Sequence, residues 1–200
     1  MTKKIVFATG NKNKVREAGE ILSALGFEVI SQKEAGVEVD VEETGRTFAE
    51  NALIKARAVA GKCPDMVVIA DDSGLVVDAL GGEPGIYSSR YMGEDTPYEV
   101  KNREIIKRLS DVEGEDRSAR FVCAIAAVLP GGKELSALGT IEGVIAHEPY
   151  GQGGFGYDPI FMVPELGKTT AELAPDEKNE ISHRGKALRA MCDLLKKENL

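Results

Sequence analysis

Residues 66–74 read MVVIADDSG, an apolar run followed directly by two adjacent carboxylates. The apolar part is rich in β-branched residues and does not alternate with polar ones, which is typical of a strand buried on both faces. We expect this strand to end where the acidic pair begins, at Asp71. A strand of this kind needs helices to cover it, so the stretch favours an α/β fold.

Helical patterns surround this strand in the sequence. Apolar spacing and capping signals predict helices at residues 15–25, 47–60, 97–109 and 184–197. The second has the Thr-x-x-Glu form of a capping box in Thr47 and Glu50. The third offers Thr96 as an N-cap before a proline at the first helical position. The apolar residues of these patterns recur on one face, as expected for helices that pack on a sheet.

Further strands predict that the sheet is mixed. Residues 5–8 form a second buried apolar run, and residues 120–129 and 134–139 flank a Pro-Gly-Gly turn as a hairpin. We expect residues 140–146 to form a separate strand. Because helices are interspersed with both buried and hairpin strands, the sequence predicts a mixed α/β sheet flanked by helices. Neither a repeat nor a linker interrupts the pattern, so we expect one domain over residues 1–200.

The charge balance limits the classes of partner. The chain has 25 Lys and Arg residues against 33 Asp and Glu residues, a formal net charge of −8. This argues against an extended basic surface for nucleic acid or for an anionic membrane. A small polyanionic substrate needs only local charge, which a few lysines, a helix N-terminus or a divalent cation held by carboxylates can supply.

Cysteine and histidine are scarce. With 3 cysteines and 2 histidines, widely separated, we expect neither a disulfide framework nor a Cys/His metal site, so oxygen atoms would bind any metal. The N-terminal segment has only a four-residue apolar run before Thr9, too short for a signal peptide or a membrane span. We therefore expect a cytoplasmic protein.

The first candidate site is the polar loop between the first strand and the first helix. Thr9–Lys14 reads TGNKNK and combines backbone N–H groups, the positive end of a helix dipole and lysine ammonium groups. These are the components of a phosphate site, although the glycines and the Lys-Ser/Thr ending of a P-loop are missing. The loop alone is equally consistent with a well-capped helix start.

The acidic pair Asp71-Asp72 is the second candidate. Adjacent carboxylates repel each other, so a divalent metal or hydrogen-bond donors must compensate for them, unless the pair simply belongs to an Asp-Ser-Gly turn. In extended backbone the two side chains point to opposite sides, so only one faces a given metal and the other anchors the chain. Glu43 either completes a metal site or offsets the dipole of the next helix. Lys55 lies two turns into that helix, where most lysines are solvated.

The third candidate is the glycine-rich segment GQGGFGYDP at residues 151–159. Its glycines let the backbone approach a ligand, and Phe155 and Tyr157 offer flat faces for stacking a base. The alternative is a flexible connection whose aromatic rings fill the core. At the start of the last helix an arginine opposes the helix dipole, so we expect His183 and Arg184 to hydrogen-bond a ligand.

Five sequence blocks, in order, resemble the inosine triphosphate pyrophosphatase family, which cleaves deaminated purine nucleoside triphosphates. The blocks are Thr9–Lys14, Glu43–Ala56, Asp71–Ser88, Gly153–Phe161 and Ser182–Gly185. The resemblance runs from residue 5 to about residue 190, through most of the chain. It implies an α/β sandwich on an elongated mixed sheet, with two lobes around a central cleft, and a homodimer.

The resemblance also implies roles for the candidate residues. Asp72 is implied to act as proton acceptor and Mg²⁺ ligand, with Glu43 near the metal. The implied contacts to the triphosphate are Thr9, Gly10, Asn11, Lys12, Asn13, Lys14, Lys55 and Ser73. The implied base pocket consists of Phe155, Gly156, Tyr157, Asp158, Lys178, His183 and Arg184. Lys12 and Asn13 occupy variable positions of the motif, so their roles stay open.

The implied activity is Mg²⁺-dependent hydrolysis of ITP, dITP and XTP to the nucleoside monophosphate and pyrophosphate. Donors such as Lys178, His183 and Arg184 would match the carbonyl that replaces the amino group of adenine. Two alternatives stay open: a phosphatase of broader nucleotide specificity, and a nucleotide-binding module without catalysis. The acidic pair favours the enzyme, because carboxylates contribute little to binding a polyanion unless they recruit a metal.

Overall fold

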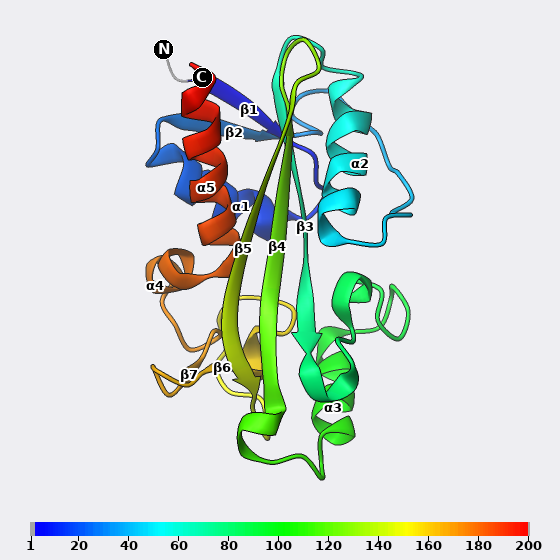
Figure 1. The fold of residues 1–200 in the computed structure, drawn as a ribbon, viewed down its shortest axis with the longest axis vertical. Helices are drawn as coiled ribbons and strands as arrows, with labels where there is room; N and C mark the ends of the chain where they lie inside the picture. Colours follow the sequence, from blue (N-terminus) through cyan, green and yellow to red (C-terminus); the bar gives the residue numbers. More distant parts are fainter. Residues whose placement is uncertain (1–2, 200) are drawn as a thin grey trace. The chain divides into compact units, whose positions relative to one another are not determined.

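Within residues 3–199, which this computed structural model describes, seven strands form one mixed sheet (Figure 1). Their order is β2-β1-β3-β4-β5-β6-β7. The strands are β1 Lys3–Phe7, β2 Phe27–Ser31, β3 Val67–Val77, β4 Ser118–Val128, β5 Glu134–Ile145, β6 Phe161–Val163 and β7 Lys168–Thr169. β1 pairs in parallel with β2 and β3, whereas β6 pairs antiparallel with β5 and β7. The prediction of a mixed sheet is confirmed.

Five α-helices accompany the sheet in the described residues. They are α1 Lys12–Ser23, α2 Phe48–Ala60, α3 Tyr98–Arg108, α4 Pro175–Ile181 and α5 His183–Lys197. Short 3₁₀ helices are η1 Asp78–Leu80, η2 Gly85–Tyr87, η3 Gly114–Arg117 and η4 Asp158–Ile160. None of the helices in residues 3–199 has the length and apolarity needed to cross a membrane.

Contacts divide the chain into two compact units. Unit 1 takes in the residues up to Ser73, Cys123–Gly139 and the residues from His183 onward. Unit 2 takes in Gly74–Val122 and Thr140–Ser182. Strands β3, β4 and β5 therefore contribute residues to both units.

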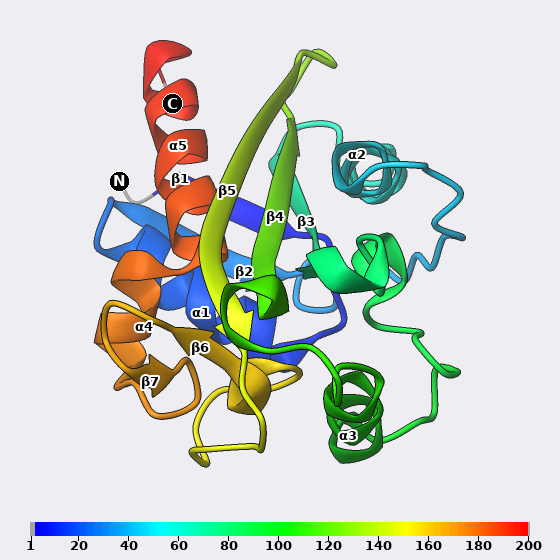
Figure 2. The ribbon, with the colours of Figure 1, turned by 60° about the horizontal axis from the view of Figure 1, so that its bottom comes forward.

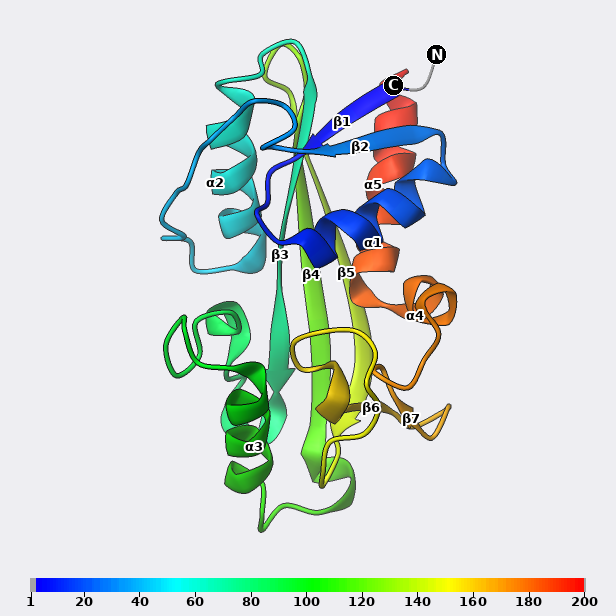
Figure 3. The same cartoon turned by 180° about the vertical axis from the view of Figure 1, so that it is seen from behind.

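Alternate residues of the first strands face two different helical layers in unit 1. Ile5, Phe7 and Ile69 belong to a core cluster with α1 and α5. Val6 and Val68 belong to a second cluster with α2. Figure 3 shows α1 and α5 on one side of these strands and α2 on the other. The prediction of strands buried on both faces is confirmed, because the period of two sends apolar side chains to both layers.

β3 extends beyond the predicted end of the buried run. It continues to Val77, so the expectation that it ends at Asp71 is wrong. Leu75 and Val77 continue the alternation of apolar residues and are fully buried, which favours extended backbone through this region. The acidic pair is therefore part of a strand and not of a turn.

Capping agrees with the prediction for α2 and differs for α3. Thr47 caps α2 by accepting a hydrogen bond from the N–H of Glu50 at 3.2 Å. The carboxylate of Glu50 accepts from the N–H of Arg46, one residue before the cap, at 2.6 Å. The prediction that Thr96 caps α3 is wrong, because Pro97 is the N-cap residue and no side chain makes a capping hydrogen bond; the Thr96 hydroxyl donates to the carbonyl of Met92 at 2.7 Å. The helix accordingly begins one residue later than predicted.

β4 and β5 form the predicted hairpin, and Figure 2 shows them side by side. The N–H of Leu129 donates to the carbonyl of Lys133 at 2.8 Å across the turn. Residues 134–139 and 140–146 are not separate strands as expected. Alternate residues from Ala137 to Ile145 are buried, so the pattern of one strand continues without a break.

Unit 2 has its own hydrophobic core. α3 contributes Ile105 and Leu109, and strands contribute Leu75, Phe121 and Phe161. The rings of Phe121 and Phe161 lie 4.4 Å apart between centroids. This core holds α3 against the part of the sheet that belongs to unit 2.

In unit 1, β5 and the first turns of α5 approach each other closely at Gly139. A Cβ atom at this position would collide with the carbonyl oxygen of His183 and lie 2.6 Å from the nitrogen of Ala187. Both are backbone atoms, so a side-chain rotation cannot relieve the contact. The absence of a side chain at Gly139 therefore sets how closely the start of α5 approaches the strand.

We expect Gly139→Ala to lower the free energy of unfolding by about 1–3 kcal/mol, because the added methyl group overpacks a backbone contact. Gly19→Ala in α1 is the matched control. No heavy atom lies within 4 Å of its added Cβ, so alanine should stabilise the helix by about 0.5–1 kcal/mol. Urea unfolding of the two variants measures both effects. Equal stabilities would contradict the steric role of Gly139.

Candidate active site

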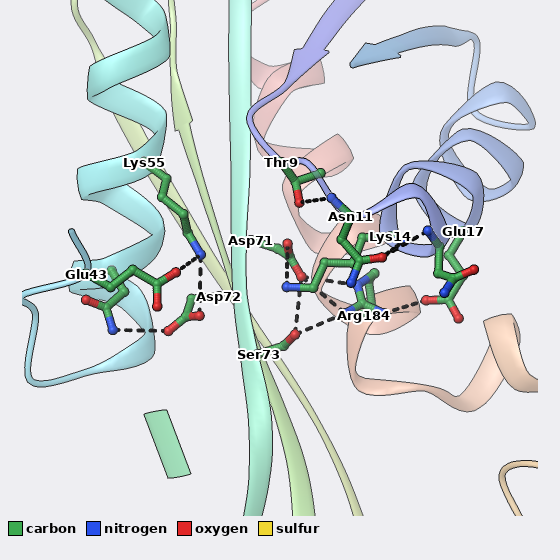
Figure 4. Close-up of polar contacts among 12 residues, drawn as sticks. Thr9, Asn11, Lys14, Glu17, Glu43, Lys55, Asp71, Asp72, Ser73 and Arg184 are labelled. Atoms are coloured by element: carbon green, nitrogen blue, oxygen red, sulfur yellow. Dashed lines mark hydrogen bonds and ion pairs between the residues drawn. The ribbon is translucent and has the colours of Figure 1, made fainter. Parts of the chain in front are cut away.

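The side chains of Asp71 and Asp72 lie on opposite sides of β3 (Figure 4). Asp72 faces Glu43 and Lys55, whereas Asp71 faces Lys14 and Arg184. The expected separation of the pair is confirmed, because consecutive residues of a strand alternate in direction. The pair therefore creates two different environments within unit 1.

On the first side, Asp72 contacts α2. Nζ of Lys55 lies 3.4 Å from Oδ1 of Asp72 and 2.6 Å from Oε1 of Glu43. Nδ2 of Asn51 donates to Oδ2 of Asp72 at 3.3 Å. Asn51 and Lys55 are four residues apart and so lie on one face of the helix. Lys55 thus joins the carboxylates of Glu43 and Asp72, and Asp72 is only 6 % exposed.

Asn51 is a site residue that we did not predict. It is fully buried, and its Oδ1 accepts a hydrogen bond from the N–H of Gly45 at 2.8 Å. A Cβ at Gly45 would lie 2.6 Å from that same oxygen, so this position has no room for a side chain. The contact holds the segment that carries Glu43 against α2. The available signal was an amide on the apolar face of α2, three residues after Phe48.

The charges on this side oppose each other. Burial raises the pKa of Asp72, the nearby Lys55 lowers it, and Glu43 raises it again, so the pKa is above its usual value. Burial lowers the pKa of Lys55, but the carboxylates of Asp72, Asp71 and Glu43 outweigh it, so the pKa of Lys55 is raised. Asp72 is therefore more basic than an exposed aspartate and lies beside a firmly protonated lysine, as suits a proton acceptor.

On the second side, Asp71 belongs to a buried ion network. Nζ of Lys14 lies 3.0 Å from its Oδ1, and Nε and Nη2 of Arg184 each donate to its Oδ2 at 3.2 Å. Nη1 of Arg184 also donates to Glu17, and Nη2 donates to the hydroxyl of Ser73 at 3.0 Å. Burial raises the pKa of Asp71, but Lys14, Arg184 and Lys55 lower it well below its usual range. Asp71 therefore remains ionised and links α1, β3 and α5.

Arg184 is more constrained than its implied role in the base pocket suggests. Arg184 is 2 % exposed, and its side-chain nitrogens donate to Asp71, Glu17 and Ser73. Glu17 was not predicted as a site residue, although an acidic residue directly before the buried Ala18 of α1 was a usable signal. The contact of Arg184 with a base stays a prediction. His183, beside it, is buried in the first turn of α5.

The loop at Thr9–Lys14 builds the start of α1. Oδ1 of Asn11 accepts from the N–H groups of Asn13 at 3.0 Å and Lys14 at 3.3 Å. Oγ1 of Thr9 accepts from the N–H of Asn11 at 3.2 Å. Gly10 is exposed, and no heavy atom lies within 4 Å of a Cβ built on it. The well-capped helix start is thus present, and phosphate binding by this loop stays a prediction.

Lys12 lies in different surroundings from Lys14. It lines a cavity of about 710 Å³ together with Thr9, Gly10, Val15 and residues of the segment 31–40. The lining residues do not include Lys14, Lys55, Asp71 or Asp72. The two lysines of the loop thus have separate surroundings, and the role of Lys12 remains open.

Unit 2 contains the remaining predicted residues. Oδ2 of Asp158 accepts from the N–H of Phe155 and from Nζ of Lys178, both at 2.7 Å. The same Nζ lies 4.9 Å from the centre of the Phe155 ring. The ring of Tyr157 does not offer a stacking face as predicted, because it is buried in the core of unit 2 and its hydroxyl donates to Ser88. Phe155 is only partly buried.

Glu43 and Asp72 fit the donor set of a magnesium site. In residues 3–199, no group of three or more His, Cys, Asp or Glu side chains is arranged to hold a metal. Mg²⁺ is commonly bound through one or two carboxylates, with phosphate and water oxygens completing the shell. Both carboxylates contact the same Lys55 nitrogen, so their oxygens lie around one shared position.

Together, the fold and the site define a class: an α/β protein in which carboxylates and lysines meet beside the parallel strands β1 and β3, an arrangement suited to a phosphate ligand. The sequence profile of the Ham1 family matches residues 5–194. The chain belongs to the Ham1 family, and the resemblance seen in its motifs is confirmed.

Known proteins of this family resemble the chain over nearly its full length. The dITP/XTP pyrophosphatase of Bacillus subtilis (strain 168) is 50% identical over 193 residues, which cover 96% of this chain and 97% of that protein. The dITP/XTP pyrophosphatase of Escherichia coli (strain K12) is 49% identical over 195 residues, or 96% and 98% of the two chains. The structure of the Staphylococcus aureus Ham1 protein superposes with a TM-score of 0.85 at 44% identity, covering 98% of this chain and all of that one.

Proposed function

We propose that this protein hydrolyses deaminated purine nucleoside triphosphates, namely ITP, dITP and XTP, to the monophosphate and pyrophosphate. The observation that carries the proposal is the contact of Lys55 with both Glu43 and Asp72. It combines a basic carboxylate with a cation, in a chain that is 50% and 49% identical to two dITP/XTP pyrophosphatases.

In the proposed reaction, Asp72 takes a proton from a water molecule. The water oxygen forms a bond to the α-phosphorus, and the bond from that phosphorus to the bridging oxygen breaks, so pyrophosphate leaves. The raised pKa of Asp72 makes it a stronger base. Asn51 holds the carboxylate in place by donating a hydrogen bond to Oδ2 of Asp72. Lys55 compensates the negative charge that gathers on the phosphates.

We propose Mg²⁺ as the cofactor, with Glu43 and Asp72 as its carboxylate ligands. Such an ion supplies charge neutralisation and a lower pKa for a bound water. On the other side of β3, we propose that the cations paired with Asp71 bind the triphosphate. Lys14, next to the capped start of α1, is the chief candidate. Thr9, Gly10, Asn11 and Ser73 complete the proposed phosphate contacts.

We expect Lys55→Met to lower kcat/KM for ITP by about 10- to 100-fold, because a charge-assisted hydrogen bond contributes about 1.5–3 kcal/mol. The variant also leaves Glu43 and Asp72 facing each other without a cation. Lys62→Met, at an exposed position just after α2, is the matched control and should change kcat/KM less than twofold. If both variants retain wild-type kinetics, Lys55 is not part of the site.

The products decide between the proposed function and its alternatives. Purified protein is incubated with ITP, XTP, ATP and GTP, with and without Mg²⁺, and pyrophosphate and orthophosphate are measured separately. We expect pyrophosphate and the monophosphate from the oxopurines, and only with Mg²⁺. Orthophosphate release would indicate a broader phosphatase, and binding without turnover would indicate a nucleotide-binding module.

We propose further that the protein acts in the cytoplasm, on the free nucleotide pool, and as a homodimer. Several large apolar side chains of unit 2 are exposed within one segment, among them Tyr87, Met92 and Val100. Exposed apolar side chains of this kind support an interface between subunits. Light scattering at micromolar concentration measures the mass, and a monomer there would contradict the dimer.

A further inference from the structure

A buried lysine joins two segments of unit 2. Lys101 of α3 is 1 % exposed, and its Nζ donates to the carbonyl of Ser89 at 2.6 Å. The same nitrogen lies 4.8 Å from the centre of the Tyr98 ring. Burial lowers the pKa of Lys101, although the charge of Glu94 raises it. A methionine would fill similar space without desolvating a cation, so what the lysine adds is the hydrogen bond to the carbonyl.

The next residue of α3 contacts the glycine-rich segment. Asn102 is 4 % exposed, and its Nδ2 donates to the carbonyl of Gly156 at 3.1 Å. Its Oδ1 is buried and has no hydrogen-bond partner within residues 3–199. A buried amide that satisfies only part of its hydrogen-bonding capacity is costly compared with an apolar side chain. Its contribution to this part of the fold is therefore the bond to Gly156.

A second bond ties the same segment to the same partner. The hydroxyl of Tyr157 donates to the carbonyl of Ser88 at 2.7 Å. The consecutive carbonyls of Ser88 and Ser89 therefore accept hydrogen bonds from Tyr157 and Lys101, respectively. The rings of Tyr98 and Tyr157 meet edge to face with centroids 5.2 Å apart. The first turn of α3, residues 88–89 and residues 156–157 thus form one closed set of contacts.

Within the implied base pocket, the two anchored residues lie between the two residues that contact Lys178. Gly156 and Tyr157 are held by α3 and by Ser88, whereas Phe155 and Asp158 on either side of them contact Lys178. Gly156 has a φ of +68°, and Tyr98 lies 3.6 Å from where its Cβ would be. A glycine backbone in this region has little intrinsic preference for one conformation. Its position must therefore come from its contacts.

We propose that Lys101 and Asn102 are positioning residues of the base loop, which we define as residues 155–158. Asn102 holds the backbone carbonyl of Gly156, and Lys101 holds residues 88–89, to which the hydroxyl of Tyr157 donates, so that Phe155 and Asp158 present one arrangement to the purine. This inference rests on the proposed function and on the base pocket that the family resemblance implies for residues 155–158. Discrimination between bases requires that the protein's hydrogen-bonding groups are held in place before the base binds. A group that is displaced no longer forms its hydrogen bond to the correct base, and selectivity is lost.

The test separates base recognition from phosphate recognition. Asn102→Leu removes the donor to Gly156, and Lys101→Met removes the donor to Ser89. For each variant, competitive inhibition of ITP hydrolysis is measured with inosine monophosphate and with pyrophosphate. We expect the Ki of inosine monophosphate and the KM of ITP to rise by about tenfold, as for the loss of one net hydrogen bond. The Ki of pyrophosphate and kcat should stay within about threefold.

Two controls make the outcome decisive. Ile105→Val shortens a fully buried side chain of the same helix, in the core cluster that also contains Tyr157, and should destabilise unit 2 by about 0.5–1.5 kcal/mol without removing a hydrogen bond that holds the base loop. Arg103→Ala changes an exposed residue of α3. If Ile105→Val raises the Ki of inosine monophosphate as much as Asn102→Leu does, the effect is general softening and the inference is wrong. It is also wrong if either positioning variant leaves that Ki unchanged.

The wild-type protein distinguishes this failure from failure of the proposed function. If wild type does not convert ITP to inosine monophosphate and pyrophosphate, the proposed function fails first. If wild type is active and the variants are not selectively impaired, only the positioning role fails. If Asn102→Leu does not fold, Lys101→Met tests the same loop. Lys101 donates to the carbonyl of Ser89, and Tyr157 of the base loop donates to the neighbouring carbonyl of Ser88.

Discussion

Asp72→Asn should reduce kcat for ITP by about 10²–10⁴-fold, the range for loss of a general base. The substitution keeps the shape of the side chain and removes its negative charge and its basicity. Because Asn51 already donates to Oδ2 of Asp72, an amide at position 72 still has a partner for its oxygen. The fold should therefore persist. Steady-state kinetics and equilibrium binding of ITP, at fixed Mg²⁺, measure turnover and binding separately.

Asp65→Asn, at an exposed position of the turn before β3, is the control and should leave kcat unchanged. Binding of ITP to the Asp72→Asn variant should weaken far less than turnover, since the base acts mainly in the transition state. A variant with near-wild-type kcat would mean that another group takes the proton.

Arg184→Ala should destabilise the protein by about 3–5 kcal/mol, the cost of leaving a buried charge without its partner. The arginine lies between Glu17 and Asp71, and all three side chains are buried. Lys14 still pairs with Asp71 in the variant, but the carboxylate of Glu17 loses its guanidinium partner. Urea unfolding monitored by circular dichroism measures the loss.

Arg57→Ala is the matched control for this prediction. Arg57 binds Glu134 through two hydrogen bonds, at 2.6 and 2.9 Å, but both side chains are exposed. Solvent screens such a pair, which contributes about 0–1 kcal/mol. Comparable losses of stability in the two variants would show that burial of Arg184 is not what makes its ion pairs important.

The same Arg184 variant tests its implied contact with the base. Loss of a donor to the purine carbonyl should lower kcat/KM for ITP more than for ATP, and narrow their ratio by about tenfold. Loss of a structural ion pair alone should depress both substrates by a similar factor, because both carry the same triphosphate. The ratio is measured below the unfolding midpoint, so that the loss of stability does not contribute.

Several local elements and the family were determined by the sequence alone, whereas β2, β6, β7 and α4 were not predicted. α2 was predictable because a cap at Thr47 and the apolar stripe through Ala52 and Ala56 lie within one short segment. The burial of β3 on both faces followed from its unbroken apolar run. The five motif blocks depend only on residue types and their order along the chain, and the match of residues 5–194 to the Ham1 family confirms them.

Pairings between distant polar residues were decided only by the tertiary structure. Glu17 and Arg184 are 167 positions apart, and Asn51 and Asp72 are 21 apart, so local periodicity could not predict either contact. The ring of Tyr157 fills the core because α3 and the strands of unit 2 surround it. β3 continued through the acidic pair because Leu75 and Val77 are buried beyond it. In each case the deciding factor is burial of side chains against chain segments that are distant in the sequence. The free energy gained by this burial is available only after those segments have packed together.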